Sequence, residues 1–455
     1  MDESVATATH VDSERGARAT HVDSERGARA TRTDPEERGV RAAFTAPGEN
    51  RVTAALTTPG EKRDTAARTD LDEIEDLLKR RADALNSKDR TSFLATVDEE
   101  MGPFLQAQKD FFERTSSLPL ASFRLSLDHR DGPEFTREKD RLKHGPSAVV
   151  ASVDQSYELQ GYDEVRTLRD LTYTFVKKAT GWRIASDTDL EELGELTDRE
   201  LWEFGPVQTR QSPHFMLMFH PSDARHADEL LAAAEDALPA VDRVWRRPWS
   251  KRVPILVPAN RAELVRLLET TFDVSSFVAF AVSSLDRKSD DAWDLGGNRI
   301  VLNRENFLRH PVPSRRSILA HELLHIASRG QSGPFTTALV DEGLAQLTGD
   351  ASPAGLNRRI RNGRFDRRLP KSWEFNTGGR DEIFNAYDES LSAFGYMTEK
   401  FGLDGVNRFY EVLGKARIEP GTDDYRLDAA LREALGVSLN DFESGWADYA
   451  VSQAG

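Results

Sequence analysis

Two histidines and a glutamate lie close together in the segment Ser317–Ser328, which reads SILAHELLHIAS. His321 and His325 are four residues apart, so both imidazoles leave the same face of a helix, one turn apart. Two neutral imidazoles on one helix face can bind a single zinc ion. Glu322 would then lie beside the metal, where it can accept a proton from a bound water as a general base.

A possible third ligand follows in the segment Val340–Ala345, which reads VDEGLA. Its glutamate, Glu342, is seventeen residues after His325. Three protein ligands leave the fourth coordination position open, which is typical of a catalytic rather than a structural zinc site. We therefore expect one Zn²⁺ per chain, bound by His321, His325 and Glu342.

The alternative to a metal site is a helix that carries two solvated histidines. With ten histidines in 455 residues, a random chain of this composition would contain His-Glu-x-x-His about 0.02 times. Apolar residues on almost every side predict that the helix is buried; they are Ile318, Leu319, Leu323, Leu324 and Ile326. Unpaired polar groups in a buried helix are costly, and a bound metal accounts for them.

The two segments together, HELLH and DEGLA, resemble the gluzincin metallopeptidases, in particular the bacterial peptidase MA-like group. In that family the glutamate of a Glu-Gly-x-Ala segment on the next helix is the third zinc ligand. The resemblance covers about residues 205–450 and implies His321, His325 and Glu342 as ligands, with Glu322 as general base. It also implies that residues 205–455 form a mixed α/β lobe followed by a helical lobe.

The same resemblance suggests auxiliary residues. Tyr387 lies in a Tyr-x-x-Ser segment like one seen after the metal helices of the family, and it could donate to the oxyanion of the reaction. A buried tyrosine with its hydroxyl bonded elsewhere is the alternative. Gln346, one turn past Glu342, could accept from a ligand imidazole, with Asp341 as another anchor. Residues 296–303 could form a sheet edge that aligns an extended substrate, or an ordinary strand.

Residues 66–190 change from a helical to a strand pattern. Apolar residues trace one helical face between Asp70 and Leu85. Strands are predicted at 123–127, 148–159, 165–176 and 182–184. Helices followed by long antiparallel strands indicate a small α+β domain with a curved antiparallel sheet. This pattern resembles the nuclear transport factor two-like (cystatin-like) cone.

The cone pattern does not assign a role, because such cones include enzymes, small-molecule binders and structural modules. Asp128 with His129, and His144, could form an acid/base pair. Exposed loop positions are the favoured interpretation of these residues, since polar side chains are usually at the surface.

Two further segments complete the predicted organisation. Residues 1–65 are of low complexity: the segment Ala8–Arg18 recurs unchanged at Ala19–Arg29, and few apolar residues are present. We expect this tail to be disordered, with its histidines solvated. Residues 191–204 are acidic and are predicted to be a helical linker.

Composition limits the partners of the protein. The net charge of −16 argues against non-specific binding to nucleic acids or anionic membranes. The chain has no cysteine, so thiolates cannot bind the zinc. We see neither a stretch of eighteen apolar residues nor a signal peptide, and we expect a cytoplasmic protein without a membrane span. The oligomeric state is not readable from the sequence.

The leading functional interpretation is a zinc-dependent metallopeptidase that acts on a peptide or protein. We favour an endopeptidase, because no Gly-x-Met-Glu-Asn segment indicates a site for a free N-terminus. A non-catalytic protein that binds peptides or another ligand with a zinc-loaded, peptidase-like domain is the alternative. A zinc hydrolase of a non-peptide amide is a third possibility. Metal content together with turnover of a casein-like mixture separates the first two.

Overall fold

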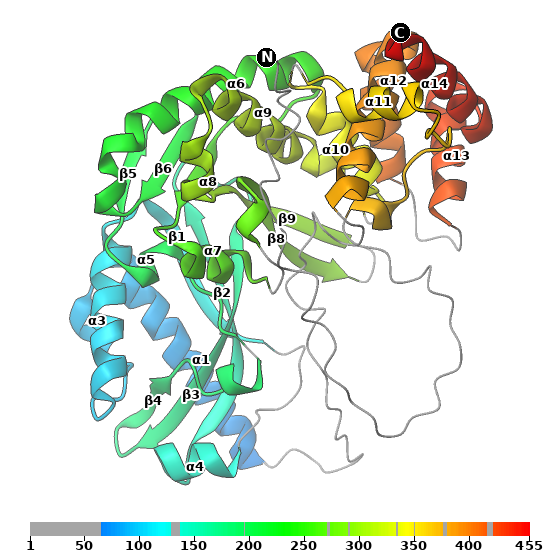
Figure 1. Cartoon of the computed structure of the whole chain (residues 1–455). Helices are drawn as coiled ribbons and strands as arrows, with labels where there is room; N and C mark the ends of the chain where they lie inside the picture. The colour runs from blue at the N-terminus through cyan, green and yellow to red at the C-terminus, as the bar shows by residue number, and fades with distance from the viewer. Residues whose placement is uncertain are drawn as a thin grey trace.

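The structure is a computed structural model of the chain. The described residues are 65–128, 137–194, 196–270, 274–289, 292–333, 335–349, 351–375, 380–415 and 422–455. The predicted disordered tail therefore lies outside the described residues except at Thr65, and so does His129. Two β-sheets with surrounding helices organise the described part, and the predicted α+β class is confirmed (Figure 1).

The N-terminal region consists of helices and a curled antiparallel sheet. Its elements are α1 (Thr65–Asn86), α2 (Arg90–Leu94), α3 (Gly102–Ser116), β1 (Leu120–Leu127), α4 (Glu138–His144), β2 (Val149–Leu159), β3 (Thr167–Lys178) and β4 (Gly181–Ser186). Each strand pairs antiparallel with the next in sequence order. The four predicted strands are thus confirmed, close to their expected bounds. α1 packs on β1 and buries Ile74, Leu77 and Leu78, which share one helical face.

The predicted helical linker is only partly helical. A short 3₁₀ turn, η3 (Glu191–Leu193), and α5 (Leu201–Phe204) lie at its two ends, and residues 196–200 between them are not helical. Asp198 accepts from the backbone N–H of Asp170, and Glu200 accepts from Arg169, so these side chains bind β3. The need to reach buried partners explains why the acidic run does not continue as one helix.

The C-terminal region begins with a second sheet. Its strands and first helices are β5 (Gln208–Gln211), β6 (Phe215–Phe219), α6 (Ala227–Val244), β7 (Val253–Val257), α7 (Arg261–Leu268), β8 (Ala279–Ser289) and β9 (Ala292–Leu302). The strand order is β5-β6-β7-β9-β8; β6, β7 and β9 are parallel, and β5 and β8 are antiparallel edge strands. The segment 296–303, considered as a sheet edge, therefore lies inside the sheet, and the edge strand is β8.

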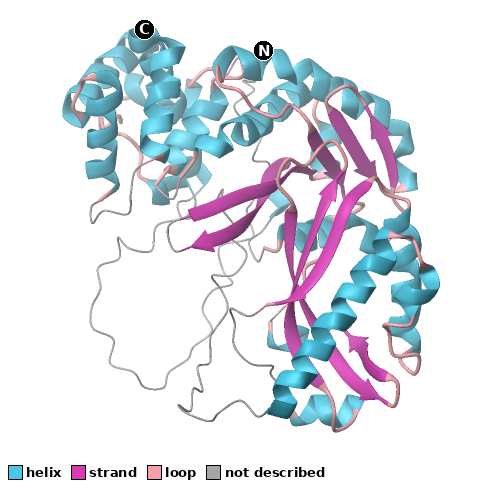
Figure 2. Ribbon diagram, turned by 180° about the vertical axis from the view of Figure 1, so that it is seen from behind, coloured by secondary structure: helices cyan, strands magenta, loops and turns pink. Residues whose placement is uncertain are grey.

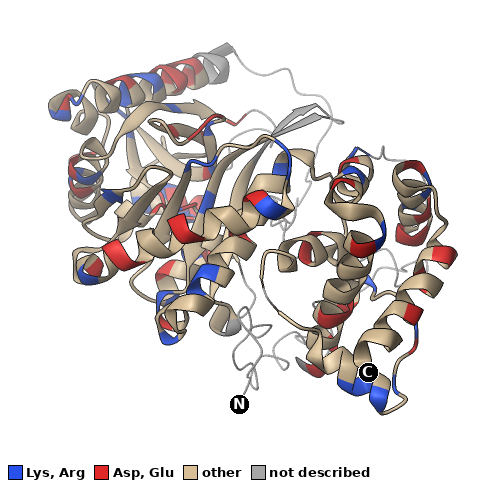
Figure 3. Cartoon of the chain, turned by 90° about the horizontal axis from the view of Figure 1, so that it is seen from above, with Lys and Arg blue, Asp and Glu red and all other residues tan. Residues whose placement is uncertain are grey.

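Helices make up the remainder of the chain. They are α8 (Arg304–Arg309), α9 (Val312–Ser328), α10 (Ala338–Gln346), α11 (Ala354–Arg361), α12 (Arg380–Gly414), α13 (Asp423–Leu435) and α14 (Leu439–Ala454). α11 to α14 gather at one end of the molecule, and the N-terminal region lies at the other, with the second sheet between them (Figures 1 and 2). Acidic and basic residues are interspersed along the helices at both ends (Figure 3).

Both faces of the second sheet are buried at its inner strands β6 and β7. Phe215, Leu217 and Phe219 belong to the buried cluster that includes α6 and α9. Met216 and Met218 point to the opposite face, because side chains alternate along a strand. These two methionines belong to the cluster that also contains the core of the N-terminal region. The two sheets therefore share one continuous apolar core.

A charged junction joins the β8–β9 hairpin to the N-terminal region. The side chain of Arg299 is 0% exposed and donates to both carboxylate oxygens of Asp163, at 2.6 and 2.9 Å. Gly296 and Gly297 pass close to residues 165–167: a Cβ on Gly296 would lie 2.3 Å from a backbone oxygen of that segment. Only glycine allows this approach, so the hairpin lies directly against the start of β3.

Within the described residues, no helix is long and apolar enough to cross a lipid bilayer.

Candidate metal centre

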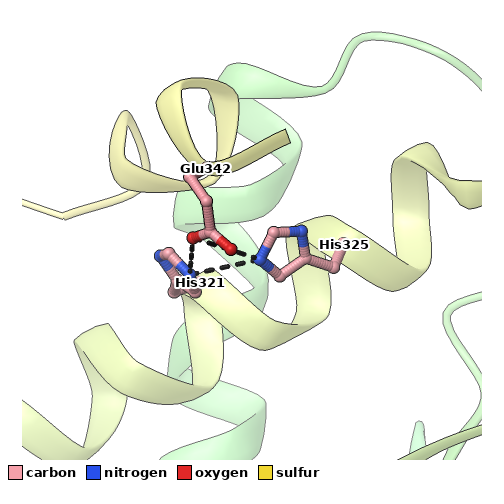
Figure 4. A group of neighbouring side chains, drawn as sticks. All are labelled: His321, His325 and Glu342. Carbon is pink, nitrogen blue, oxygen red and sulfur yellow. Dashed lines mark hydrogen bonds and ion pairs between the residues drawn. The ribbon is translucent and has the colours of Figure 1, made fainter. Parts of the chain in front are cut away.

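His321 and His325 on α9 and Glu342 on α10 converge on one point (Figure 4). His321 Nε2 lies 3.2 Å from His325 Nε2 and 3.1 Å from Glu342 Oε2. His325 Nε2 lies 3.8 Å from the same carboxylate oxygen. Among the described residues, this is the one group of three His, Cys, Asp or Glu side chains that could hold a metal ion.

The separations fit a single metal ion. Two atoms that each lie about 2 Å from a tetrahedral zinc ion are about 3.3 Å apart. The three observed separations, 3.1, 3.2 and 3.8 Å, lie close to that value before any side chain moves. Two imidazole nitrogens and one carboxylate oxygen are also a donor set that is typical of catalytic zinc. The predicted ligand residues therefore form a group that could hold a metal ion.

Packing explains how the sequence brings the ligands together. Leu319, Leu323 and Leu324 are buried in the core around α9, which fixes the rotation of the helix and aims the histidines at α10. Gly343 follows the candidate ligand Glu342 directly, and a Cβ on it would lie 2.4 Å from the ring of Phe394 on α12. The missing side chain lets α10 lie flat on α12.

The two imidazoles are held in different electrostatic states. Burial lowers the pKa of His325 to about 3, although the charge of Glu342 opposes this shift. Burial also acts to lower the pKa of His321, but the hydrogen bond and the charge of Glu342 outweigh it, and that pKa is raised. A metal cation would take the place of the proton that His321 and Glu342 share, since neutral imidazole and ionised carboxylate are the binding forms.

Glu322 lies beside this group on α9. Its residue is 5% exposed, and burial raises the pKa of its carboxyl group to about 7 while His321 opposes the shift. The backbone N–H of Ala281 on the edge strand β8 donates to the carboxylate. A carboxyl group with a pKa near neutrality can both accept and release a proton at physiological pH.

Tyr387 lies beside Glu342. Its hydroxyl is hydrogen-bonded to Glu342, and burial together with the charges of Glu342 and Glu322 raises its pKa well above the usual value. Its ring packs against Phe375, with 5.4 Å between the centroids. We had expected Gln346 to accept a hydrogen bond from an imidazole, but it does not. Its amide instead donates to the Tyr387 carbonyl at 2.9 Å and thereby supports α12.

Asp341 is held away from the ligand group by a separate network. Its carboxylate accepts from the hydroxyl of Tyr410, and burial raises its pKa to about 7 against the charge of Arg329. Arg329, just past the end of α9, donates to the Ser283 hydroxyl at 2.7 Å and to the Ala281 carbonyl at 3.2 Å. Arg329 thus holds β8 against α9 at Ala281, the residue whose N–H donates to Glu322.

Sequence reasoning missed Arg329, Tyr410 and Ala281. The one signal for Arg329 was a charged residue at the end of a nearly apolar helix, which indicates a buried partner. Nothing in the sequence indicates the contact of Ala281, because a backbone donor can belong to any residue type.

We had expected His144 to lie at the surface, but the structure places its side chain in the interior. Its side chain is 1% exposed, and its Nε2 lies 2.8 Å from Asp189 Oδ2. Asp189 follows β4 and is 45 residues away in sequence, so local spacing could not reveal this pair.

No model of a known protein family matches the chain, and no curated protein matches its sequence. The functional argument therefore rests on the arrangement of the site.

Proposed function

We propose that this protein is a zinc-dependent metallopeptidase of gluzincin type, with His321, His325 and Glu342 as the zinc ligands and Glu322 as the general base. The observation that carries the proposal is the position of Glu322: it is a buried carboxyl group with a pKa of about 7 on the same helix as two converging imidazoles. A zinc ion bound there would act as a Lewis acid on the carbonyl of the substrate and on a water molecule.

The residues of the chain have separate tasks in the proposed reaction. The carboxylate of Glu322 accepts a proton from the attacking water and passes it to the nitrogen of the leaving amine. The N–H of Ala281 holds that carboxylate in place. The hydroxyl of Tyr387, next to Glu342, donates to the oxygen that becomes negatively charged.

The edge strand supports a peptide as the substrate. β8 (Ala279–Ser289) is the outermost strand of its sheet and contacts α9, which carries the histidines. Backbone groups on the free side of an edge strand can pair with an extended chain. We infer that an unfolded segment of a protein or peptide adds to this edge beyond Ser283, where Arg329 no longer occupies it.

Metal content and turnover test the proposal together. We expect one zinc per chain by elemental analysis after dialysis, and hydrolysis of a casein-like mixture that a chelator abolishes and zinc restores. His325→Ala and Glu342→Ala should each lose the zinc, because two remaining ligands bind it poorly. His226→Ala and Glu305→Ala are matched controls outside the group, and both should keep it.

Three outcomes would contradict parts of this assignment. Stoichiometric zinc in Glu342→Ala would show that the third ligand is wrong. A different metal at one ion per chain would contradict zinc but not the ligand set. Zinc-loaded protein that cleaves no peptide would favour the non-catalytic peptide-binding alternative.

A further inference from the structure

A cavity of about 510 Å³ lies in the N-terminal region and shares no residue with the metal centre. It is open to solvent on one side and is lined by α3, the end of α4, the end of β4 and the segment around α5. Binding sites for small molecules usually have volumes of about 300–1,000 Å³. The size of the cavity therefore allows a small ligand, and its lining decides which kind.

One wall of the cavity is apolar. Phe104, Ala107 and Phe111 recur on one face of α3, and Phe204 of α5 also lines the cavity. Phe111 is fixed by its neighbours, because its ring stacks on Phe93 at a centroid distance of 6.0 Å. A wall of aromatic rings suits a flat apolar group.

Gln108 introduces a fixed hydrogen-bond donor into the cavity. The residue is only 5% exposed, and its Oε1 accepts from the buried guanidinium of Arg81. That contact fixes the orientation of the amide, so Nε2 is the amide atom that is left to bind a ligand. Within the described part of the chain, Nε2 has no hydrogen-bond partner.

Arg199 provides a second donor. Its Nη1 donates both to Asp187, at 2.6 Å, and to Glu203, at 3.1 Å, and all three residues line the cavity. Its Nη2 has no partner among the described residues. Arg81 lies close enough to interact electrostatically with both carboxylates. Two guanidinium groups thus balance the two acidic residues, and the cavity does not repel an anion.

His144 also lines the cavity and has an unsatisfied nitrogen. Its side chain is 1% exposed, and its Nε2 is bonded to Asp189. Its Nδ1 is buried without a hydrogen-bond partner in the described structure. An unpaired buried polar atom is costly, so a partner in the cavity would be stabilising.

We propose that this cavity binds a small molecule with an apolar, ring-sized body and a carboxylate head. The body lies on the rings of Phe104 and Phe111. The carboxylate accepts hydrogen bonds from Gln108 Nε2 and Arg199 Nη2, because these are donors that the protein leaves unpaired. A hydrogen bond to a charged group is about twice as strong as a neutral one, so the cavity prefers a carboxylate to an amide. The inference does not depend on the proposed peptidase activity.

Calorimetry with phenylacetate and its neutral analogue phenylacetamide, on the full chain, tests the proposal. We expect phenylacetate to bind once per chain and phenylacetamide to bind about tenfold more weakly or less. Ala107→Phe fills the apolar wall and should abolish binding. Gln108→Leu should weaken binding about tenfold, whereas Gln106→Leu, an exposed position on the same helix, should leave it unchanged.

Several results would overturn the proposal. They are the absence of phenylacetate binding to the folded chain at millimolar concentration, equal affinity for the neutral amide, and unchanged binding in Ala107→Phe. Ala107→Phe removes no hydrogen-bonding group, so it remains informative if Gln108→Leu unfolds the region. Zinc content and casein turnover should not change in any of these variants, which keeps this test separate from that of the metal centre.

Discussion

Two groups of buried charges in this protein are arranged in opposite ways. At the junction of the two sheets, Arg299 and Asp163 are 0% and 2% exposed and oppose each other directly. At the metal centre, Glu322 and Glu342 lie beside two imidazoles, one of which is held neutral. Each charge at the junction has an opposite charge of its own. The candidate metal centre instead consists of imidazoles and carboxyl groups, which can donate electron pairs to a cation.

This difference separates a structural from a functional use of buried charge. In an ion pair each charge is neutralised by its partner, so no further ligand is needed, and the pair holds two segments in register. Buried carboxyl groups and imidazoles that lie close together perturb one another's pKa values, and such perturbation is common at catalytic sites. The predictions below address the two places in turn.

The largest effect is expected from Glu322→Gln. The amide keeps the shape of the side chain but cannot accept the proton, so turnover should fall by about 10²–10⁴-fold. Zinc content and melting temperature should stay close to those of the unchanged protein. Initial rates of casein hydrolysis measure the effect, and near-normal turnover would remove Glu322 from the mechanism.

At the junction, Asp163→Ala should lower the free energy of unfolding by about 3–5 kcal/mol, because it leaves the buried Arg299 without its partner. Replacing both residues, as Asp163→Leu with Arg299→Met, should recover most of that loss. Chemical denaturation measures both variants. A double variant as unstable as the single one would mean that the pair contributes more than mutual neutralisation.

Arg329→Met tests the link between the strand edge and the base. Without the hydrogen bonds to Ser283 and Ala281, β8 should be held less firmly against Glu322. We expect kcat to fall about tenfold with little change in KM or zinc content, since a small misplacement of a catalytic group is costly. Arg329→Lys should recover part of the rate. Unchanged kcat in Arg329→Met would show that β8 is positioned by other contacts.

The smallest effect is a pH dependence of stability at Glu269, which lies 3.5 Å from Arg169 of β3. Burial raises the pKa of Glu269 to about 7, although Arg169 opposes the shift. A glutamate in an unfolded chain titrates near pH 4.3, so between these values the folded protein holds a proton that the unfolded chain has lost. This contribution to stability is complete below about pH 4.3 and is lost as the pH rises to about 7.

Glu269→Gln should therefore reduce the loss of stability between about pH 5 and pH 7 by about 2 kcal/mol. Denaturation at the two pH values measures the difference. Glu305→Gln, at an exposed position, is the control and should keep the pH dependence. An identical pH profile in Glu269→Gln would show that Glu269 is ionised in the folded protein.

The sequence predicted the parts of the molecule that depend on local spacing. The histidine pair and the strands of the first sheet follow from periods of two or of three to four residues, and Glu342 was identified from a nearby segment that resembles a family pattern. Tyr387 was recognised from a short segment that resembles a family pattern. Each of these predictions relates residues that lie near one another in sequence.

The features that the sequence did not predict all depend on distant residues. The side chain of Met216 meets the core of the N-terminal region, although its strand looks like any buried apolar strand. The partner of His144 is 45 residues away. β8 becomes the sheet edge because β9 inserts between β7 and β8, an order that no local pattern specifies.

The β8–β9 hairpin has a consequence for how the protein can evolve. One end of it reaches Glu322 through Ala281, and its glycines lie directly against the N-terminal region. Recombination that attached a different N-terminal module would leave the hairpin without the surface to which it is fitted. Exchange of either region would therefore require compensating changes in the other, and a side chain at Gly296 or Gly297 would disturb the contact of the hairpin with residues 165–167.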